Sequence, residues 1–244
     1  MNHNLRNFTL QLADNALILG HRISEWCGHG PALEQDIALA NIALDHVGQS
    51  RMYYQHAAEI EGGKTEDDYA YRRDVLEFKN LLLLEHENVD FGYTIARSFF
   101  YDHFHYLLLK ELTNVDYEPI AQIAAQAIKE VKYHKRYSSD WMRRLGDGTE
   151  ESHAKTESAI ETLWPYVEEL FMADEVEIDF VNHKDLKENW LSLVTDVLSE
   201  ATLELPDPIW PQKGGKQGLH TEHLGFILAD MQFLQRAYPE AKAW

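Results

Sequence analysis

Apolar residues recur with the 3.6-residue period of an α-helix along nearly the whole chain, and this pattern restricts the fold more than any other feature. A first stripe runs from Phe8 to Trp26, and Gly28 and Pro31 follow it, as expected for residues that end helices. No segment alternates apolar and polar residues in the way that strands require. The sequence therefore predicts an all-α fold.

The same period predicts the remaining helices and the irregular segments between them. A second stripe is expected to face the core in a helix that ends near Ile60, and it comprises Leu33, Ile37, Ala40, Leu44 and Val47. Further helices are expected at about residues 71–84, 95–109, 120–141, 160–170, 190–201 and 221–236, with irregular chain at 61–68, 114–119, 174–182 and 205–218. Two long hairpins, at about 8–60 and 91–145, resemble each other. We expect one helical domain over residues 1–244.

Charge and composition exclude several classes of function. The net charge is −19, from 41 acidic residues against 22 Lys and Arg, and such a surface repels both nucleic acid and anionic lipid. Neither a signal-peptide core nor a run of about 18 apolar residues is present, so we expect a cytoplasmic protein without membrane partners. The single cysteine, Cys27, cannot form an internal disulfide, and we expect a buried, unreactive thiol.

Four of the predicted helices carry an acid near their middle, as in carboxylate-bridged di-iron bundles; the acids are Asp14, Asp45, Asp102 and Glu130. Two helices of such a bundle also carry Glu-x-x-His, because residues three apart share a helix face. Here the position three residues after Asp45 is Gly48, and the position three residues after Glu130 is Tyr133. The metal site is therefore predicted to be degenerate, with no metal ligand, cofactor-binding residue or catalytic residue assigned.

The interior acids still need compensation, because buried charges are paired in folded proteins. Their expected partners are His46, His105, Lys129, His134 and Arg97. The alternative is a working metal pair, since His105 lies three residues after Asp102 and His134 lies four residues after Glu130. Pairing within the protein is the favoured interpretation.

Two further pairs have metal-ligand spacing but simpler explanations. Glu150 and His153 lie at a turn and helix start, where an acid stabilises the helix N-terminus. His220 and His223 flank Thr221, which is expected to be the N-cap of the last helix. The sequence shows no glycine-rich phosphate loop, nucleotide-binding fingerprint or serine-protease-like order of residues.

Several stretches together resemble the family of the C subunit of the bacterial phenylacetyl-CoA epoxidase, a multicomponent ring-oxygenating monooxygenase of the ferritin-like superfamily. They are residues 25–29 (Glu-Trp-Cys-Gly-His), 36–45 with Gly48 and Gln49, 128–134, and 214–225 followed by Met231 and Gln232. The most specific of them is 214–225, Gly-Gly-Lys-Gln-Gly-Leu-His-Thr-Glu-His-Leu-Gly. They are spread over essentially the full chain.

The resemblance implies a ferritin-like bundle with additional C-terminal helices and a structural, non-catalytic role beside a homologous catalytic subunit. It places the di-iron site in that partner, and flavin, an iron–sulfur cluster and NADPH in a reductase, with a bridging subunit between them. The implied reaction is the oxygen- and NADPH-dependent epoxidation of the aromatic ring of phenylacetyl-CoA. Lys213 and Lys216 form a small positive spot on an acidic chain. It is compatible with a CoA phosphate or an acidic patch on a partner, although two solvated lysines explain it more simply.

Two other functions stay open at this point. A free-standing di-iron oxidase or oxygenase, or an iron-storage protein, would bind about two metal ions per chain and lose them when Asp45, Asp102 or Glu130 is removed. A homo-oligomeric helical scaffold would self-associate without any partner.

Overall fold

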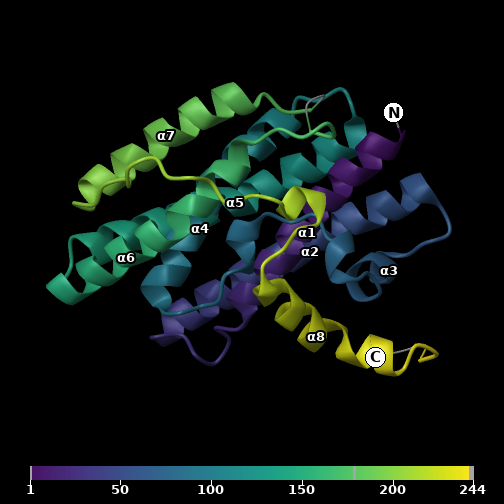
Figure 1. Cartoon of the computed structure of the whole chain (residues 1–244), viewed down its shortest axis with the longest axis horizontal. Helices are drawn as coiled ribbons and strands as arrows, with labels where there is room; N and C mark the ends of the chain where they lie inside the picture. Colours follow the sequence, from purple (N-terminus) through teal and green to yellow (C-terminus); the bar gives the residue numbers. More distant parts are fainter. Residues whose placement is uncertain (1, 178–179, 242–244) are drawn as a thin grey trace.

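The computed structural model describes residues 2–177 and 180–241, and no strand occurs among them, which confirms the all-α prediction. Two long hairpins form the centre of the molecule. In the first, α1 (Asn2–Ser24) packs along α2 (Leu33–Glu61), and in the second α4 (Phe91–Leu112) packs along α5 (Glu118–Gly146). Contacts between α2 and α5 join the hairpins into a four-helix bundle (Figure 1).

Four further helices surround this bundle, as a ferritin-like fold with additional C-terminal helices requires. On one side, α6 (Glu150–Val167) and α7 (His183–Glu200) pack on α4 and α5. On the other, α8 (Glu222–Ala237) lies against the short α3 (Glu66–Tyr71) and projects from the bundle (Figure 1). None of the described helices is both long and apolar enough to cross a bilayer.

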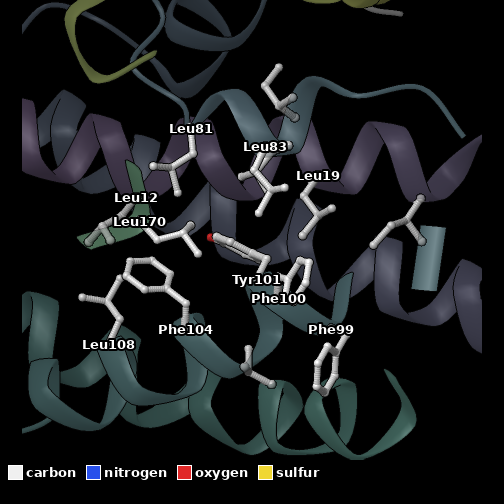
Figure 2. Close-up of a cluster of buried hydrophobic side chains, with 14 of the residues drawn as sticks. Leu12, Leu19, Leu81, Leu83, Phe99, Phe100, Tyr101, Phe104, Leu108 and Leu170 are labelled. Atoms are coloured by element: carbon white, nitrogen blue, oxygen red, sulfur yellow. The ribbon is translucent and has the colours of Figure 1, made fainter. Parts of the chain in front are cut away.

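The core lies between the two hairpins and is rich in leucine and phenylalanine. Figure 2 shows leucines of α1 facing an aromatic group on α4, with leucines of the chain between α3 and α4 beside them: Leu12, Leu19, Phe99, Phe100, Phe104, Leu81 and Leu83 (Figure 2). Each of these side chains is buried. Burial of this kind is the main source of stability for a helical bundle.

The helix predicted at residues 71–84 is wrong. The chain there is largely irregular, with only short 3₁₀ turns at Val75–Glu77 and Leu82–Glu85. Its backbone amides are satisfied by interior side chains: Lys79 donates to Asp14, Leu81 to Asn15 and Leu82 to Glu169, each at 2.8 Å. A buried chain needs partners for its amides, and side chains of other elements supply them in place of a helix. We call residues 72–90 the buried linker.

The second apolar stripe faces outward on α2, contrary to the prediction. Leu33, Ile37, Leu44 and Val47 are exposed, by 72%, 52%, 68% and 40% respectively. The buried face of α2 consists of Leu39, Ile42, Ala43, His46, Gln49, Ser50, Tyr53, Tyr54, His56 and Ala57. Polar residues are therefore turned inward and apolar residues outward. We call Leu33, Ile37, Leu44 and Val47 the outer α2 row.

Smaller corrections concern single residues. Cys27 is exposed, because it lies in the turn that follows α1. Thr221 is the N-cap residue of α8, but its side chain makes no capping bond and donates to Glu85. The irregular segments at 61–68 and 205–218 are interrupted by the start of α3 and by a 3₁₀ turn at Gly215–Gln217. In the segment at 174–182, Ile178 and Asp179 lie outside the described residues.

Candidate functional site

The four acids lie on the four helices of the bundle, but they have different surroundings. Asp14 on α1 and Asp102 on α4 are buried, whereas Asp45 on α2 and Glu130 on α5 are partly exposed. The only group of three or more metal-ligand side chains found in the described part of the chain contains Asp102 and none of the other three acids.

Asp14 is neutralised by an arginine that the sequence did not indicate. Arg73, from the buried linker, donates from Nη1 to Oδ2 of Asp14 at 3.1 Å and from Nη2 to Oδ1. The Tyr54 hydroxyl and the amide of Lys79 also donate to this carboxylate. None of the partners expected from the sequence contacts Asp14, because Arg73 reaches it across 59 residues of chain.

Asp45 and Glu130 each bind a side chain of the opposite helix. Nε2 of His134 lies 2.9 Å from Oδ2 of Asp45, and Nε2 of Gln49 donates to Oε2 of Glu130 at 2.9 Å. His134 is one of the partners expected from the sequence. Lys129 is exposed, and no described contact joins it to an acid. Arg97 is buried but donates to the carbonyl of His86 and to Asn88, so this expectation was wrong.

Asp102 has no cationic side chain paired with it, and one of its carboxylate oxygens, Oδ1, is buried without a hydrogen-bond partner. Burial raises the pKa of Asp102 to about 6, and the nearby His134 and a hydrogen bond from Ser138 offset this only in part. Ligand atoms of His46, Asp102 and His134 all lie within 4.8 Å of one another. These three buried side chains, on α2, α4 and α5, form what we call the interior cluster.

His105 adjoins the interior cluster. Its ring stacks on that of His46 with centroids 6.0 Å apart, and the rings of His46 and His134 are 5.0 Å apart. Burial lowers the pKa of His105 to about 3 and that of His46 well below its usual value, with neighbouring histidines adding to both effects. The two rings are therefore neutral at physiological pH and have nitrogen lone pairs to offer.

Gly48 and Tyr133 lie outside the cluster. Gly48 is exposed, nothing lies within 4 Å of a Cβ built on it, and the side chain of Tyr133 is 40% exposed. A histidine at either position would start from the surface. The imidazoles that do reach the interior, His46 and His134, follow Asp45 by one residue and Glu130 by four. The sequence signal for His46 was its place on the buried α2 face, three and seven residues beyond Ala43 and Leu39.

A carboxylate-bridged metal pair does not fit this set of donors. Asp14 is held by Arg73 and Tyr54, and Glu130 accepts a hydrogen bond from Gln49. Only Asp102 among the four acids belongs to the interior cluster. Two iron ions with their positive charge need several carboxylates and two Glu-x-x-His pairs, and the cluster supplies one carboxylate.

The other candidate pairs have structural roles. Glu150 lies in the first turn of α6, as expected, and His153 contacts the carbonyl of Gly146 through Nδ1 at 2.7 Å. His220 lies between Oε1 of Glu85, 2.6 Å from Nδ1, and the carbonyl of Phe78, 2.9 Å from Nε2. His220 and His223 therefore do not share a metal position, since both ring nitrogens of His220 are engaged.

The glycine-rich motif at 214–225 closes over the buried linker. The amides of Gly214 and Gly215 donate to Oε1 of Glu169 at 2.8 and 2.9 Å. A Cβ on Gly215 would lie 2.1 Å from the carbonyl oxygen of Asn80, so a larger residue cannot make this approach. The motif thus binds the C-terminal segment to the linker.

Lys216 is not a solvated loop lysine. It is buried, and its Nζ donates to Oε2 of Glu177 at 2.6 Å and to the carbonyl of Met172 at 2.8 Å. Lys213 alone is exposed. The positive spot expected from the sequence is therefore reduced to one side chain.

Comparison with known proteins agrees with the motifs. The family model described as "Phenylacetic acid catabolic protein" matches residues 1–244. Among its relatives, the C subunit of 1,2-phenylacetyl-CoA epoxidase from Escherichia coli (strain K12) is 46% identical over 241 residues. That alignment covers 96% of this chain and 97% of the relative. The resemblance drawn from the motifs is confirmed.

Proposed function

The chain belongs to the phenylacetic acid catabolic protein family, and from this premise we propose that it is a non-catalytic subunit of a phenylacetyl-CoA epoxidase. The relative is named as one subunit of that enzyme, and the alignment runs over nearly the whole of both chains. In this proposal the chain stabilises a homologous catalytic subunit in the cytoplasm. The di-iron centre belongs to that subunit, and flavin, iron–sulfur cluster and NADPH belong to a reductase reached through a bridging subunit.

The observation that carries the non-catalytic role is the engagement of Asp14 by Arg73 in the bundle interior. An acid that binds a guanidinium and a tyrosine hydroxyl is not free to bridge two metal ions. This chain would then contribute no step of ring oxidation itself. Its contribution would be to fold rigidly and to present a surface to the catalytic chain.

The outer α2 row supports a partner subunit. Its four apolar residues follow one helix face, and monomeric proteins rarely expose such a continuous apolar row. The neighbouring α5 exposes Lys129, Arg136 and Arg144 on an otherwise acidic chain. In a symmetric contact between two copies, this face would meet itself and bring like charges together. We therefore propose that the row binds the catalytic subunit, through an apolar helix face with an acidic rim.

Co-expression with the catalytic subunit tests the proposal. We expect a stable complex of the two chains, and turnover that is retained when Asp102 of this chain is changed to asparagine. The isolated chain should contain negligible iron. About two iron ions per isolated chain would instead support a free-standing di-iron enzyme or iron-storage protein. Self-association without any complex, measured by sedimentation, would support the homo-oligomeric scaffold.

A further inference from the structure

The interior cluster contains more unsatisfied polar atoms than a structural core tolerates. Buried without a hydrogen-bond partner are both ring nitrogens of His46, Nδ1 of His134, Nδ1 of His105 and Oδ1 of Asp102. Each such atom has lost its hydrogen bond to water on folding and gained none in return. Natural cores contain few of them, and here they are gathered where α2, α4 and α5 meet. Four are nitrogens and one is a carboxylate oxygen, the atoms that bind metal ions.

The contact of His134 with Asp45 prepares one of these nitrogens. A carboxylate can only accept a hydrogen bond, so Nε2 of His134, 2.9 Å from Oδ2 of Asp45, carries the proton. The lone pair is then on Nδ1, the atom left without a partner in the interior. Carboxylates that orient histidine in this way are typical neighbours of metal-binding imidazoles. Asp45 would therefore be a positioning residue outside the ligand set.

We propose that His46, Asp102 and His134 bind a single divalent transition-metal ion of the zinc class. Two imidazoles and one carboxylate suit Zn²⁺ or Co²⁺ better than Mg²⁺ or Ca²⁺, which prefer oxygen ligands alone. A water molecule or His105, whose ring stacks on that of His46, completes the shell. The one carboxylate and two neutral imidazoles balance one ion and do not balance two.

The spacing of the donors is compatible with this ion after a small closure. The ligand atoms lie within 4.8 Å of one another. Donors about 2.1 Å from a tetrahedral ion lie about 3.4 Å apart. Rotation of the three side chains about their own bonds covers this difference, and the helices need not move. Bound there, the ion would join α2, α4 and α5 at the contact between the two hairpins.

Metal titration of the full isolated chain tests the site. After treatment with EDTA, we expect Co²⁺ to bind one ion per chain and to give the intense visible absorption of a tetrahedral site. Zn²⁺ should displace it and raise the melting temperature of the chain. The substitutions His46→Ala, His134→Ala and Asp102→Asn should each weaken binding at least 100-fold. Asp102→Asn keeps the size of the side chain, so it tests the ligand even if an alanine variant fails to fold.

Two variants serve as controls. Asp45→Asn should weaken binding about 10- to 100-fold while one ion per chain still binds at saturation, as expected for a residue that orients a ligand. His103→Gln should leave binding unchanged, because His103 is also buried on α4 but contacts the carbonyl of Phe99 at 2.9 Å. The proposal is overturned if Asp102→Asn binds Co²⁺ as tightly as the native chain, if two ions bind, or if none binds. None of these results depends on a partner subunit, so each is distinguishable from failure of the proposed function.

Discussion

Arg73 binds Asp14 from the buried linker, with Nη1 3.1 Å from Oδ2, and both side chains are buried. The guanidinium also donates to the carbonyls of Tyr69 and Glu77, at 2.7 and 3.1 Å. It lies over the ring of Phe78, 4.1 Å from the centroid. One arginine therefore joins α1, α3 and the linker, at an acid position that metal-binding bundles use for iron.

Replacing Arg73 by methionine should destabilise the chain by about 3–5 kcal/mol, because it leaves Asp14 buried without a cation. The double variant Asp14→Asn/Arg73→Met should recover part of this loss, since both charges are then removed. Urea unfolding measures both changes. The matched control is Arg72→Met, because Arg72 is exposed and pairs only with Asp68 at the surface. A cost below about 1 kcal/mol for Arg73→Met would show that the pair does not hold the linker.

Glu85 should be required for docking of the C-terminal segment. Its two oxygens accept from Asn80 and from the amide and hydroxyl of Thr221, and Oε1 also contacts His220. Glu85→Ala leaves these buried groups without an acceptor, which should cost about 3 kcal/mol or more. Limited proteolysis should then cut residues 205–221 faster than in the native chain. Glu87→Ala, at an exposed carboxylate two residues away, is the control, and equal cleavage of both variants would contradict the assignment.

Protonation of His86 should make the chain less stable in acid. Burial lowers the pKa of His86 to about 4, and the nearby Arg97, His223 and Arg22 add to the effect. Its ring is also enclosed by Tyr93 and Tyr166, which carry no charge at these pH values. The folded chain therefore binds fewer protons than the unfolded chain between pH 6.5 and 4. Stability is full above pH 6.5 and is lost as the pH falls towards 4, by up to about 3 kcal/mol.

The substitution His86→Gln separates this histidine from the others. Urea unfolding at several pH values should show a slope smaller by about one proton between pH 6.5 and 4 in the variant. His183, whose pKa burial lowers to about 4, continues to titrate in both proteins and provides the internal reference. An unchanged slope would mean that His86 is protonated equally in the folded and unfolded chains.

The sequence predicted the long helices well, because their apolar period is a local property. It failed for residues 71–84, since the buried linker is held by Asp14, Asn15 and Glu169, which lie far away in sequence. Local propensity cannot report such contacts. The outer α2 row failed for a different reason: an apolar stripe predicts a buried face only when the chain has no partner to bind.

The candidate site was predicted in part. The four acids were placed on the correct helices, and the contact of Asp45 with His134 was among the expected pairs. The convergence of His46 with Asp102 was missed, because Glu-x-x-His spacing does not apply to His46, which is adjacent to an acid in the sequence. Helix rotation of about 100° per residue places adjacent residues on different faces, so Asp45 is partly exposed while His46 is buried.

Leu44→Glu should disrupt the complex with the catalytic subunit and leave this chain folded. Leu44 is 68% exposed near the middle of α2, so a charge there costs the isolated chain little. In the complex, the same charge would be buried in an apolar contact, which should weaken association at least tenfold. Ile209→Glu is the control, since Ile209 is 59% exposed in the loop beside α6 and α7. Titration calorimetry with the catalytic subunit measures both variants. Equal affinities would place the interface elsewhere, whereas loss of homodimers alone in the Leu44 variant would assign the row to a second copy of this chain.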